Sequence, residues 1–426
     1  MKSTFESENL KRRVFREIDN RKKEIIRLCS DMIKAPSENP PGDTLAVASI
    51  VKDHLSEIGL DSKLYEPKKG LFNLVSTNRK GSGPSLVYNA HMDVFPAGDR
   101  EKWAFDPFSG RISSKRVYGR GAVDMKGGLV ASLAAYSVMG SLDIELPGTL
   151  AIAFACDEEV AGPWGTRWIL ENVKHLAWDA CIIGEPSGTD CVVYGEKGVN
   201  FVSIQVESSG SAHSSAPFVE SALLNAATIV RRGEELQEQK CLIPRNLRSL
   251  IKFQKKSFAK QYGAKVAESI DHVSLNVGTI KGGIAPNMIC PYCEMKACFR
   301  VPFSISPEKV VQTWIRKTKS DSRSLRTKFT LDARFEATYT NPKESVVLCA
   351  TQNALKILGR APRLTFSLWG TDGRYMRKKG IPTVIYGPSP DTMATFNEFI
   401  DVEELLQVAK VHAGAAFDYL WKSKRL

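Results

Sequence analysis

The sequence predicts an α/β fold, in which a larger domain with a mostly parallel sheet and helices on both faces is interrupted by a smaller α+β domain. Short apolar runs at residues 85–88, 148–156 and 181–183 indicate strands buried on both faces. Amphipathic segments with helical spacing lie between such runs. Between residues 189 and 302 the pattern changes to alternating, half-exposed strands with segregated helices. At 426 residues the chain is long enough for about two domains.

The larger domain is expected to consist of residues 1–188 and 303–426, with residues 189–302 inserted. The apolar positions of residues 7–34 recur at helical spacing and stop before Pro36. Gly59 closes a second amphipathic helix. In chain order, the remaining expected helices are 44–58, 127–139, 220–232, 307–319, 345–358 and 402–420, and the other expected strands are 62–65, 73–76, 200–206, 273–280, 294–301, 328–337, 364–367 and 383–386.

Ligand-type side chains follow the strand of residues 85–88. His91 and Asp93 lie at its C-terminal end, where open α/β sheets bind ligands. Asp124 stands at the start of the next helix, where backbone N–H groups favour an anion. We interpret His91 as a metal ligand whose second ring nitrogen is held by Asp93. Taken singly, a buried turn histidine and an ordinary helix N-cap are the alternatives.

Further carboxylates follow two other predicted strands. The run at 148–156 ends in Asp157, Glu158 and Glu159, and the run at 181–183 is followed by Glu185. Clustered negative charge beside a core is costly unless cations neutralise it, although a solvated acidic loop is an alternative. One imidazole and several carboxylate oxygens are ligands that suit zinc or a similar divalent ion. The absence of sulfur favours an open, catalytic site.

Composition excludes several classes of partner. The net charge is +12, but the basic residues near the start alternate with acidic ones, so we expect neither nucleic acid nor a membrane as partner. No apolar run approaches the length of a membrane-spanning helix. An odd number of cysteines and no signal-like N-terminal run predict reduced thiols in a cytoplasmic protein. The nine cysteines are at positions 29, 156, 181, 191, 241, 290, 293, 298 and 349.

Many short motifs occur in one order along the chain. They are HMDVFPAG, YGRGAVDMKGG, ACDEE, GEPSG, SAHSSAP, APNM, GTDGR and NEFI. In this the sequence resembles the metal-dependent amidohydrolase and peptidase family that contains acetylornithine deacetylase, succinyl-diaminopimelate desuccinylase, the aminoacylases and glutamate carboxypeptidase. The resemblance extends from about Ala35 to the C-terminal helix. It implies that the larger domain is catalytic and the inserted one a dimerisation or lid domain, and hence a homodimer.

The resemblance also implies roles for the acidic residues. Asp124 would bridge two zinc ions, with His91 and Glu185 completing one site and Glu159 the other; cobalt or manganese are alternatives. Glu158 resembles the general base, which takes a proton from water and passes it to the leaving amine.

Three further residues match family positions outside this cluster, and the turn chemistry adds a fourth candidate. His213 resembles a histidine that reaches the neighbouring subunit's site and stabilises an oxyanion. Asn287 and Arg300 resemble substrate-binding residues, with a turn residue and a strand-end ion pair as alternatives. Thr371, in a Gly-rich turn, would offer its hydroxyl to an anionic substrate end, or be a plain turn residue.

One position departs from the family. Family members carry a metal-binding histidine three residues before the Asn-Glu pair, but here Ala394 precedes Asn397 and Glu398. A methyl group cannot coordinate a metal, so the second site is expected to be weakened, with Asp391 as a substitute candidate.

Three hypotheses follow. The first is a zinc-dependent hydrolase of the amide bond of N-acyl amino acids, or a dipeptidase or carboxypeptidase of the same family, impaired by Ala394. The second is an inactive relative that keeps metal and binds acyl amino acids. The third, nucleic-acid binding through the basic surplus, lacks any groove-reading motif and predicts strong salt dependence.

Overall fold

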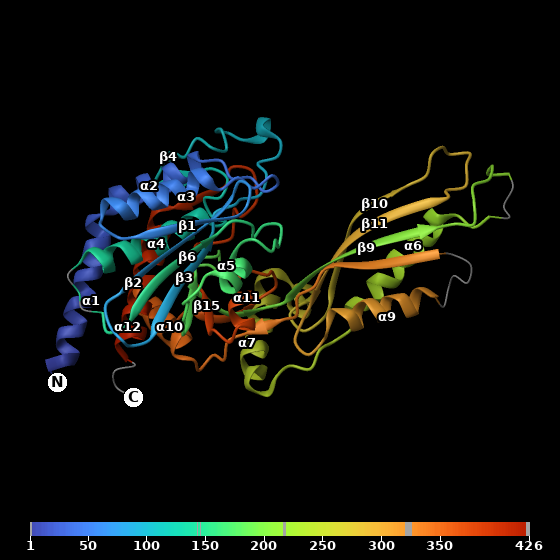
Figure 1. The fold of residues 1–426 in the computed structure, drawn as a ribbon. Coiled ribbons are helices and arrows are strands. Elements are labelled where there is room, and N and C mark those ends of the chain that lie inside the picture. Colours follow the sequence, from blue (N-terminus) through green and yellow to red (C-terminus); the bar gives the residue numbers. More distant parts are fainter. Residues whose placement is uncertain (1, 143, 145, 216–218, 320–325, 423–426) are drawn as a thin grey trace. The chain divides into compact units, whose positions relative to one another are not determined.

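The computed structural model describes all residues except 1, 143, 145, 216–218, 320–325 and 423–426 (Figure 1). The chain forms two compact units. Unit 1 comprises Met1–Tyr194, Tyr339–Thr365 and Thr371–Leu426, and unit 2 comprises Gly195–Thr338 and Phe366–Gly370. In the described part of the chain, no helix is both long and apolar enough to span a membrane.

A nine-stranded sheet forms the centre of unit 1. Its strands run in the order β1-β2-β6-β3-β7-β15-β8-β13, and β14 pairs with β8. The inner strands β6, β3, β7 and β15 are parallel to one another. At one side of them, β2 pairs antiparallel with β6, and β1 pairs antiparallel with β2. The strands are β1 (Ser62–Lys68), β2 (Leu71–Arg79), β3 (Ser85–His91), β6 (Thr149–Ala155), β7 (Ala180–Ile183), β8 (Cys191–Glu196), β13 (Thr338–Tyr339), β14 (Arg363–Ser367) and β15 (Thr383–Ile385).

Helices cover both faces of this sheet, as predicted. Successive side chains of a strand point to opposite faces. On β3, the Tyr88 hydroxyl donates to the His412 carbonyl of α12 at 2.8 Å, while the neighbouring Asn89 amide donates to the Thr166 hydroxyl of α5 at 2.9 Å. Helices α4 and α10 pack on α12, and α11 packs on α5. The bounds are α4 (Lys126–Ser141), α5 (Thr166–Asn172), α10 (Ser345–Leu358), α11 (Gly373–Lys378) and α12 (Val402–Lys422).

The N-terminal segment forms two helices where one was predicted over residues 7–34. They are α1 (Lys2–Asn20) and α2 (Lys22–Lys34), followed by α3 (Leu45–Glu57). Helices α1 and α2 meet at Arg21, whose ψ of 12° departs from the helical value. A 3₁₀ turn, η1 (Arg100–Lys102), and a small sheet of β4 (Arg111–Ser113), β5 (Arg116–Tyr118) and β16 (Phe399–Asp401) complete unit 1.

Unit 2 is built on an antiparallel sheet in the order β10-β11-β9-β12. The predicted boundary at residue 302 is too early, because β12 pairs with β9 along its length and α9 packs against α6. The strands are β9 (Gly198–Glu207), β10 (Ser274–Gly282), β11 (Tyr292–Val301) and β12 (Arg326–Ala333). The helices are α6 (Ala222–Glu234), η2 (Glu235–Glu238), η3 (Arg245–Leu247), α7 (Arg248–Tyr262), α8 (Ala264–Glu268) and α9 (Pro307–Lys319).

Candidate metal centre

His91 is the last residue of β3 and is almost completely buried, with 1% of its surface exposed. Its Nδ1 lies 2.9 Å from the Asp93 main-chain carbonyl, which can only accept, so Nδ1 carries the proton. Its Nε2 faces Asp124 Oδ1 at 3.2 Å and Glu185 Oε1 at 3.4 Å. When the imidazole is neutral, its Nε2 lone pair faces these two acceptor oxygens, an arrangement that a cation between them would satisfy.

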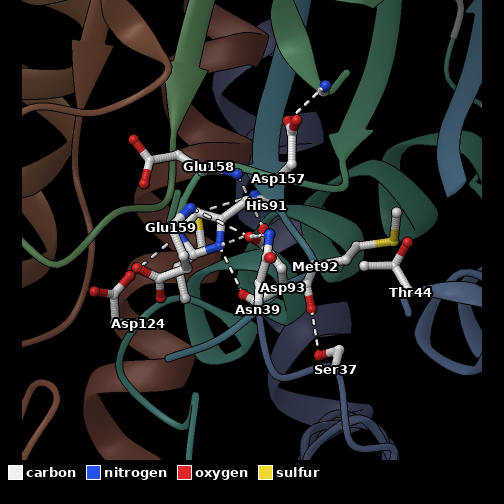
Figure 2. A network of polar contacts seen from close by, with 12 residues as sticks. Ser37, Asn39, Thr44, His91, Met92, Asp93, Asp124, Asp157, Glu158 and Glu159 are labelled. Carbon is white, nitrogen blue, oxygen red and sulfur yellow. Dashed lines mark hydrogen bonds and ion pairs between the residues drawn. The ribbon is translucent and has the colours of Figure 1, made fainter. Parts of the chain in front are cut away.

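The carboxylates predicted from separate strands converge on this imidazole. His91, Asp124 and Glu159 each offer a ligand atom within 4.8 Å of the others, and His91, Glu158 and Glu185 do the same. Figure 2 shows Asp124, Glu158 and Glu159 close to the His91 ring. His91 and the three glutamates meet because they end or follow β3, β6 and β7, which are parallel neighbours whose C-terminal ends lie at one edge of the sheet. Asp124 joins them from the turn before α4.

Asp157, the first of three consecutive carboxylates, does not belong to either cluster. Its two oxygens accept the N–H groups of Trp164 at 2.8 Å and Gly165 at 2.6 Å. Asp157 thus shapes the loop after β6, and the two following glutamates face His91. The sequence alone gave no signal that separated the first carboxylate from the other two.

Asp93 has a broader role than the one predicted. Its carboxylate Oδ1 lies 3.4 Å from His91 Nδ1, farther than its own main-chain carbonyl. The carboxylate oxygens accept the N–H groups of Glu158 and Glu159, each at 3.2 Å, and the Asn39 amide at 2.9 Å (Figure 2). Asp93 therefore fixes the loop that carries both glutamates, while its main chain orients the His91 ring.

The turn that carries Asp124 is fixed by Glu398, whose structural role sequence reasoning missed. Glu398 is fully buried, and its Oε1 accepts the N–H groups of Val123 at 2.8 Å and Asp124 at 3.1 Å. Its Oε2 pairs with the Arg120 guanidinium at 2.6 Å. Asp124 precedes α4, which begins at Lys126, by two residues. The sequence predicted Asp124 at the start of the helix, and in the structure it lies in the turn immediately before that start.

The electrostatics of the cluster are those of excess negative charge. Burial and the nearby Asp124 carboxylate together raise the pKa of Glu185 to about 7. Burial also raises the pKa of Glu158 and Glu159 well above the ordinary value. Burial by itself would lower the pKa of His91, but Glu185 and the neighbouring aspartates raise it well above its usual range. A bound divalent cation would relieve this repulsion.

Arg374 supplies the positive charge nearest to Glu158. Its Nη2 donates to Glu158 Oε1 at 2.9 Å, and the two side chains are only 6% and 11% exposed. Glu159 Oε1, by contrast, is buried without a hydrogen-bond partner among the described residues. A buried carboxylate oxygen without a partner, beside an imidazole, fits the role of a metal ligand.

The other predicted site residues belong to neither ligand cluster of the described residues. His213 and Asn287 belong to unit 2 and come together there, since Ser214 N–H donates to the Asn287 carbonyl at 3.0 Å and His213 bridges to Met288. Arg300 lies on β11 opposite Ser274. Thr371, in unit 1, is fully buried and its hydroxyl accepts the Gly373 N–H at 3.0 Å, as in the plain-turn alternative.

Ala394 lies in an exposed turn with φ of +58°, and its carbonyl accepts from Arg120 Nη2 at 3.4 Å. Neither metal-ligand cluster of the described residues includes Asp391. The loop before Asn397 therefore contributes no side chain to either cluster.

The sequence matches peptidase family M20/M25/M40 over residues 87–418. The chain belongs to this family. The matched residues include both ligand clusters, the Asn397-Glu398 pair and Ala394. The chain is thus a hydrolase of the M20 family, as the motif order indicated.

Named relatives differ in the group they remove. The chain is 25% identical over 405 residues to succinyl-diaminopimelate desuccinylase of Pseudoalteromonas atlantica, covering 92% of this chain and 97% of the relative. It is 26% identical over 428 residues to N-formyl-4-amino-5-aminomethyl-2-methylpyrimidine deformylase of Bacillus subtilis, covering 93% and 94%. An M20 family metallo-carboxypeptidase from Sulfolobus solfataricus shares the fold, with TM-score 0.80, 22% identity and coverage of 93% and 99%.

Proposed function

We propose that this M20 hydrolase is a metal-dependent amidohydrolase that removes a small acyl group from the nitrogen of an amino acid or a related amine. The observation that carries the proposal is the position of Glu158 beside the ligand set His91, Asp124 and Glu185. The two named enzyme relatives, a desuccinylase and a deformylase, support an N-acyl substrate.

The residues fit one divalent ion well. Nε2 of His91 and oxygens of Asp124 and Glu185 would hold it, and the orphaned Glu159 Oε1 would join Asp124 at a second ion. Nitrogen and carboxylate ligands favour zinc, with cobalt or manganese as alternatives. The chemistry that such an ion supplies when bound is Lewis-acid activation of water and polarisation of the amide carbonyl.

Glu158 performs the proton transfers in this proposal. Its carboxylate accepts a proton from water as the water oxygen attacks the carbonyl carbon, and it then donates that proton to the nitrogen as the C–N bond breaks. The products are the free carboxylic acid and the amine. Burial, which raises the pKa of Glu158, favours a group that can return the proton.

Ala394 makes the two ion positions unequal. The first has an imidazole and two carboxylates, whereas the second has only Asp124 and Glu159 among the described residues. We infer that the first ion binds tightly and the second weakly, so that the chain with Ala394 is an impaired hydrolase or one that works with a single tightly held ion.

Residues of unit 2 are proposed to complete the substrate site in a homodimer. Edge strand β10 is exposed over its second half, including Ile280 at 48%, and an unpaired edge is a template for pairing with a second copy. His213 would then act on the oxyanion, and Asn287 and Arg300 on the substrate. Sedimentation of the intact chain tests the dimer.

A panel of N-formyl, N-acetyl and N-succinyl amino acids tests the activity. Each compound is assayed with wild type, Glu158→Gln and Ala394→His at defined zinc concentrations. We expect turnover by wild type on at least one class, roughly 10²–10⁴-fold less by Glu158→Gln, and a second ion with increased turnover for Ala394→His. Metal content is measured by mass spectrometry.

The same panel tests the alternative of a non-catalytic binding protein, which Ala394 favours. That alternative predicts calorimetric binding of an acyl amino acid without product, both in wild type and in Ala394→His. Equal inactivity of all three forms across the panel would contradict the hydrolase.

A further inference from the structure

Glu158 differs from the other carboxylates around His91 in having an arginine partner. Arg374 Nη2 lies 2.9 Å from Glu158 Oε1, within charge-assisted hydrogen-bond distance. Among the described residues, Asp124, Glu159 and Glu185 form no ion pair with any lysine or arginine. The single guanidinium of the cluster is thus directed at the residue that we propose to carry the proton.

Asp372, two residues before Arg374, connects it to strand β3. Asp372 Oδ1 lies 4.0 Å from its Nη2, and Asp372 Oδ2 accepts the Thr166 hydroxyl at 2.6 Å. Thr166 Oγ1 in turn accepts the Asn89 amide of β3 at 2.9 Å. A continuous series of contacts therefore links the strand that carries His91 to the guanidinium, and a short helix, α11, carries the arginine.

This geometry leaves the two oxygens of Glu158 unequal. Oε1 is engaged by Arg374, so Oε2 is the oxygen left to exchange a proton with water and with the leaving nitrogen. A glutamate has three side-chain torsions, and an unpaired one would sample several rotamers. Because catalysis depends on reacting atoms placed to within about 1 Å, this freedom would slow the reaction.

Resting on the proposed function, we propose that Arg374 is a positioning residue: it holds the Glu158 side chain in the one rotamer that presents Oε2 to the substrate water. It touches neither the substrate nor a metal ligand in this role. The arginine belongs to the GTDGR turn, where sequence reasoning singled out Thr371 instead.

The experiment compares Arg374→Ala and Arg374→Lys with Arg377→Ala. Arg377 lies one turn further along α11, donates to the Thr383 carbonyl at 3.3 Å and belongs to neither ligand cluster. We expect Arg374→Ala to lower kcat about 100-fold with KM and metal content nearly unchanged. Arg374→Lys should retain part of kcat, and added guanidinium should partly restore Arg374→Ala only.

Three results would overturn the inference. These are kcat of Arg374→Ala within about threefold of wild type, a rise in KM in place of a fall in kcat, or an equal loss in Arg377→Ala. The first would show that the pair is dispensable, the second that Arg374 binds substrate, and the third that α11 as a whole is damaged.

Crystal structures of zinc-loaded wild type and Arg374→Ala give a readout that needs no turnover. We expect one Glu158 conformer in wild type and several in the variant, and a single unchanged conformer in both would refute the positioning role. If wild type hydrolyses nothing in the N-acyl panel, the proposed function fails, yet this structural comparison still decides whether Arg374 positions Glu158.

Discussion

Unit 1 contains two fully buried histidines in opposite electrostatic surroundings. His91, at the sheet edge, faces Asp124 and Glu185, and these carboxylates hold its pKa well above the usual range. The ring nitrogens of His412, on α12, face the Tyr386 carbonyl at 2.7 Å and the Ser132 hydroxyl at 3.1 Å. Burial lowers its pKa to about 4.

Burial alone therefore does not mark a metal ligand. Both rings have their hydrogen-bonding capacity directed at specific groups, but only one faces anions. A neutral imidazole with a carbonyl and a hydroxyl is already satisfied, whereas the His91 cluster carries negative charge that a cation would balance.

The largest difference is expected in metal content. We expect His91→Gln to bind zinc more than about 100-fold more weakly than wild type, a larger loss than outer-shell changes cause, and His412→Gln to bind it normally. Titration against a chelator, with metal analysis of the purified proteins, measures both. A normal zinc affinity in His91→Gln would show that the carboxylates alone form the site.

Stability at acid pH is expected to depend on His412. In the unfolded chain this histidine takes up a proton near its ordinary pKa of 6.5, and in the folded chain only near about 4. The contribution of neutral His412 to the free energy of unfolding, about 3 kcal/mol, is therefore complete above about pH 6.5 and is lost as the pH falls toward 4.

Urea unfolding of the metal-free protein at pH 7.5, 5.5 and 4.5 measures this contribution. His412→Gln should flatten the pH dependence of the free energy of unfolding over this window. An identical slope in wild type and variant would assign the acid sensitivity to other groups.

Asp93→Asn is expected to weaken zinc binding and turnover roughly 10–100-fold. The change removes the negative charge that accepts hydrogen bonds from the N–H groups of Glu158 and Glu159. One of the two accepting oxygens is replaced by an amide NH₂ group, which is itself a donor and cannot accept these bonds. Calorimetric zinc titration and steady-state kinetics measure the two effects. Asp99→Asn, at an exposed 3₁₀ turn, serves as the control and should match wild type.

Ser132→Ala should lower the free energy of unfolding by about 1–2 kcal/mol, because His412 Nδ1 would be left buried without a donor. Denaturant unfolding at pH 7.5 measures the change. Unchanged stability would mean that the Ser132 hydroxyl donates to the Gly128 carbonyl instead, which lies 3.0 Å away.

The fold class, most element positions and the ligand types could be predicted from the amino-acid sequence. Apolar runs buried on both faces indicated the inner strands, and each was followed by an acidic residue or by His91. Because parallel strands end at one edge of a sheet, the convergence of these side chains could be predicted before the structure. The ordered motifs indicated the family, and Ala394 was visible as a departure from it.

Only the tertiary structure decided which oxygens address which groups. Asp157, Glu158 and Glu159 are equivalent as sequence, but one caps a loop, one pairs with Arg374 and one has an orphaned oxygen. The partners of Glu398 and the extent of unit 2 likewise depend on pairings between residues far apart in the chain. Such contacts depend on side-chain direction and strand register, which local patterns do not specify.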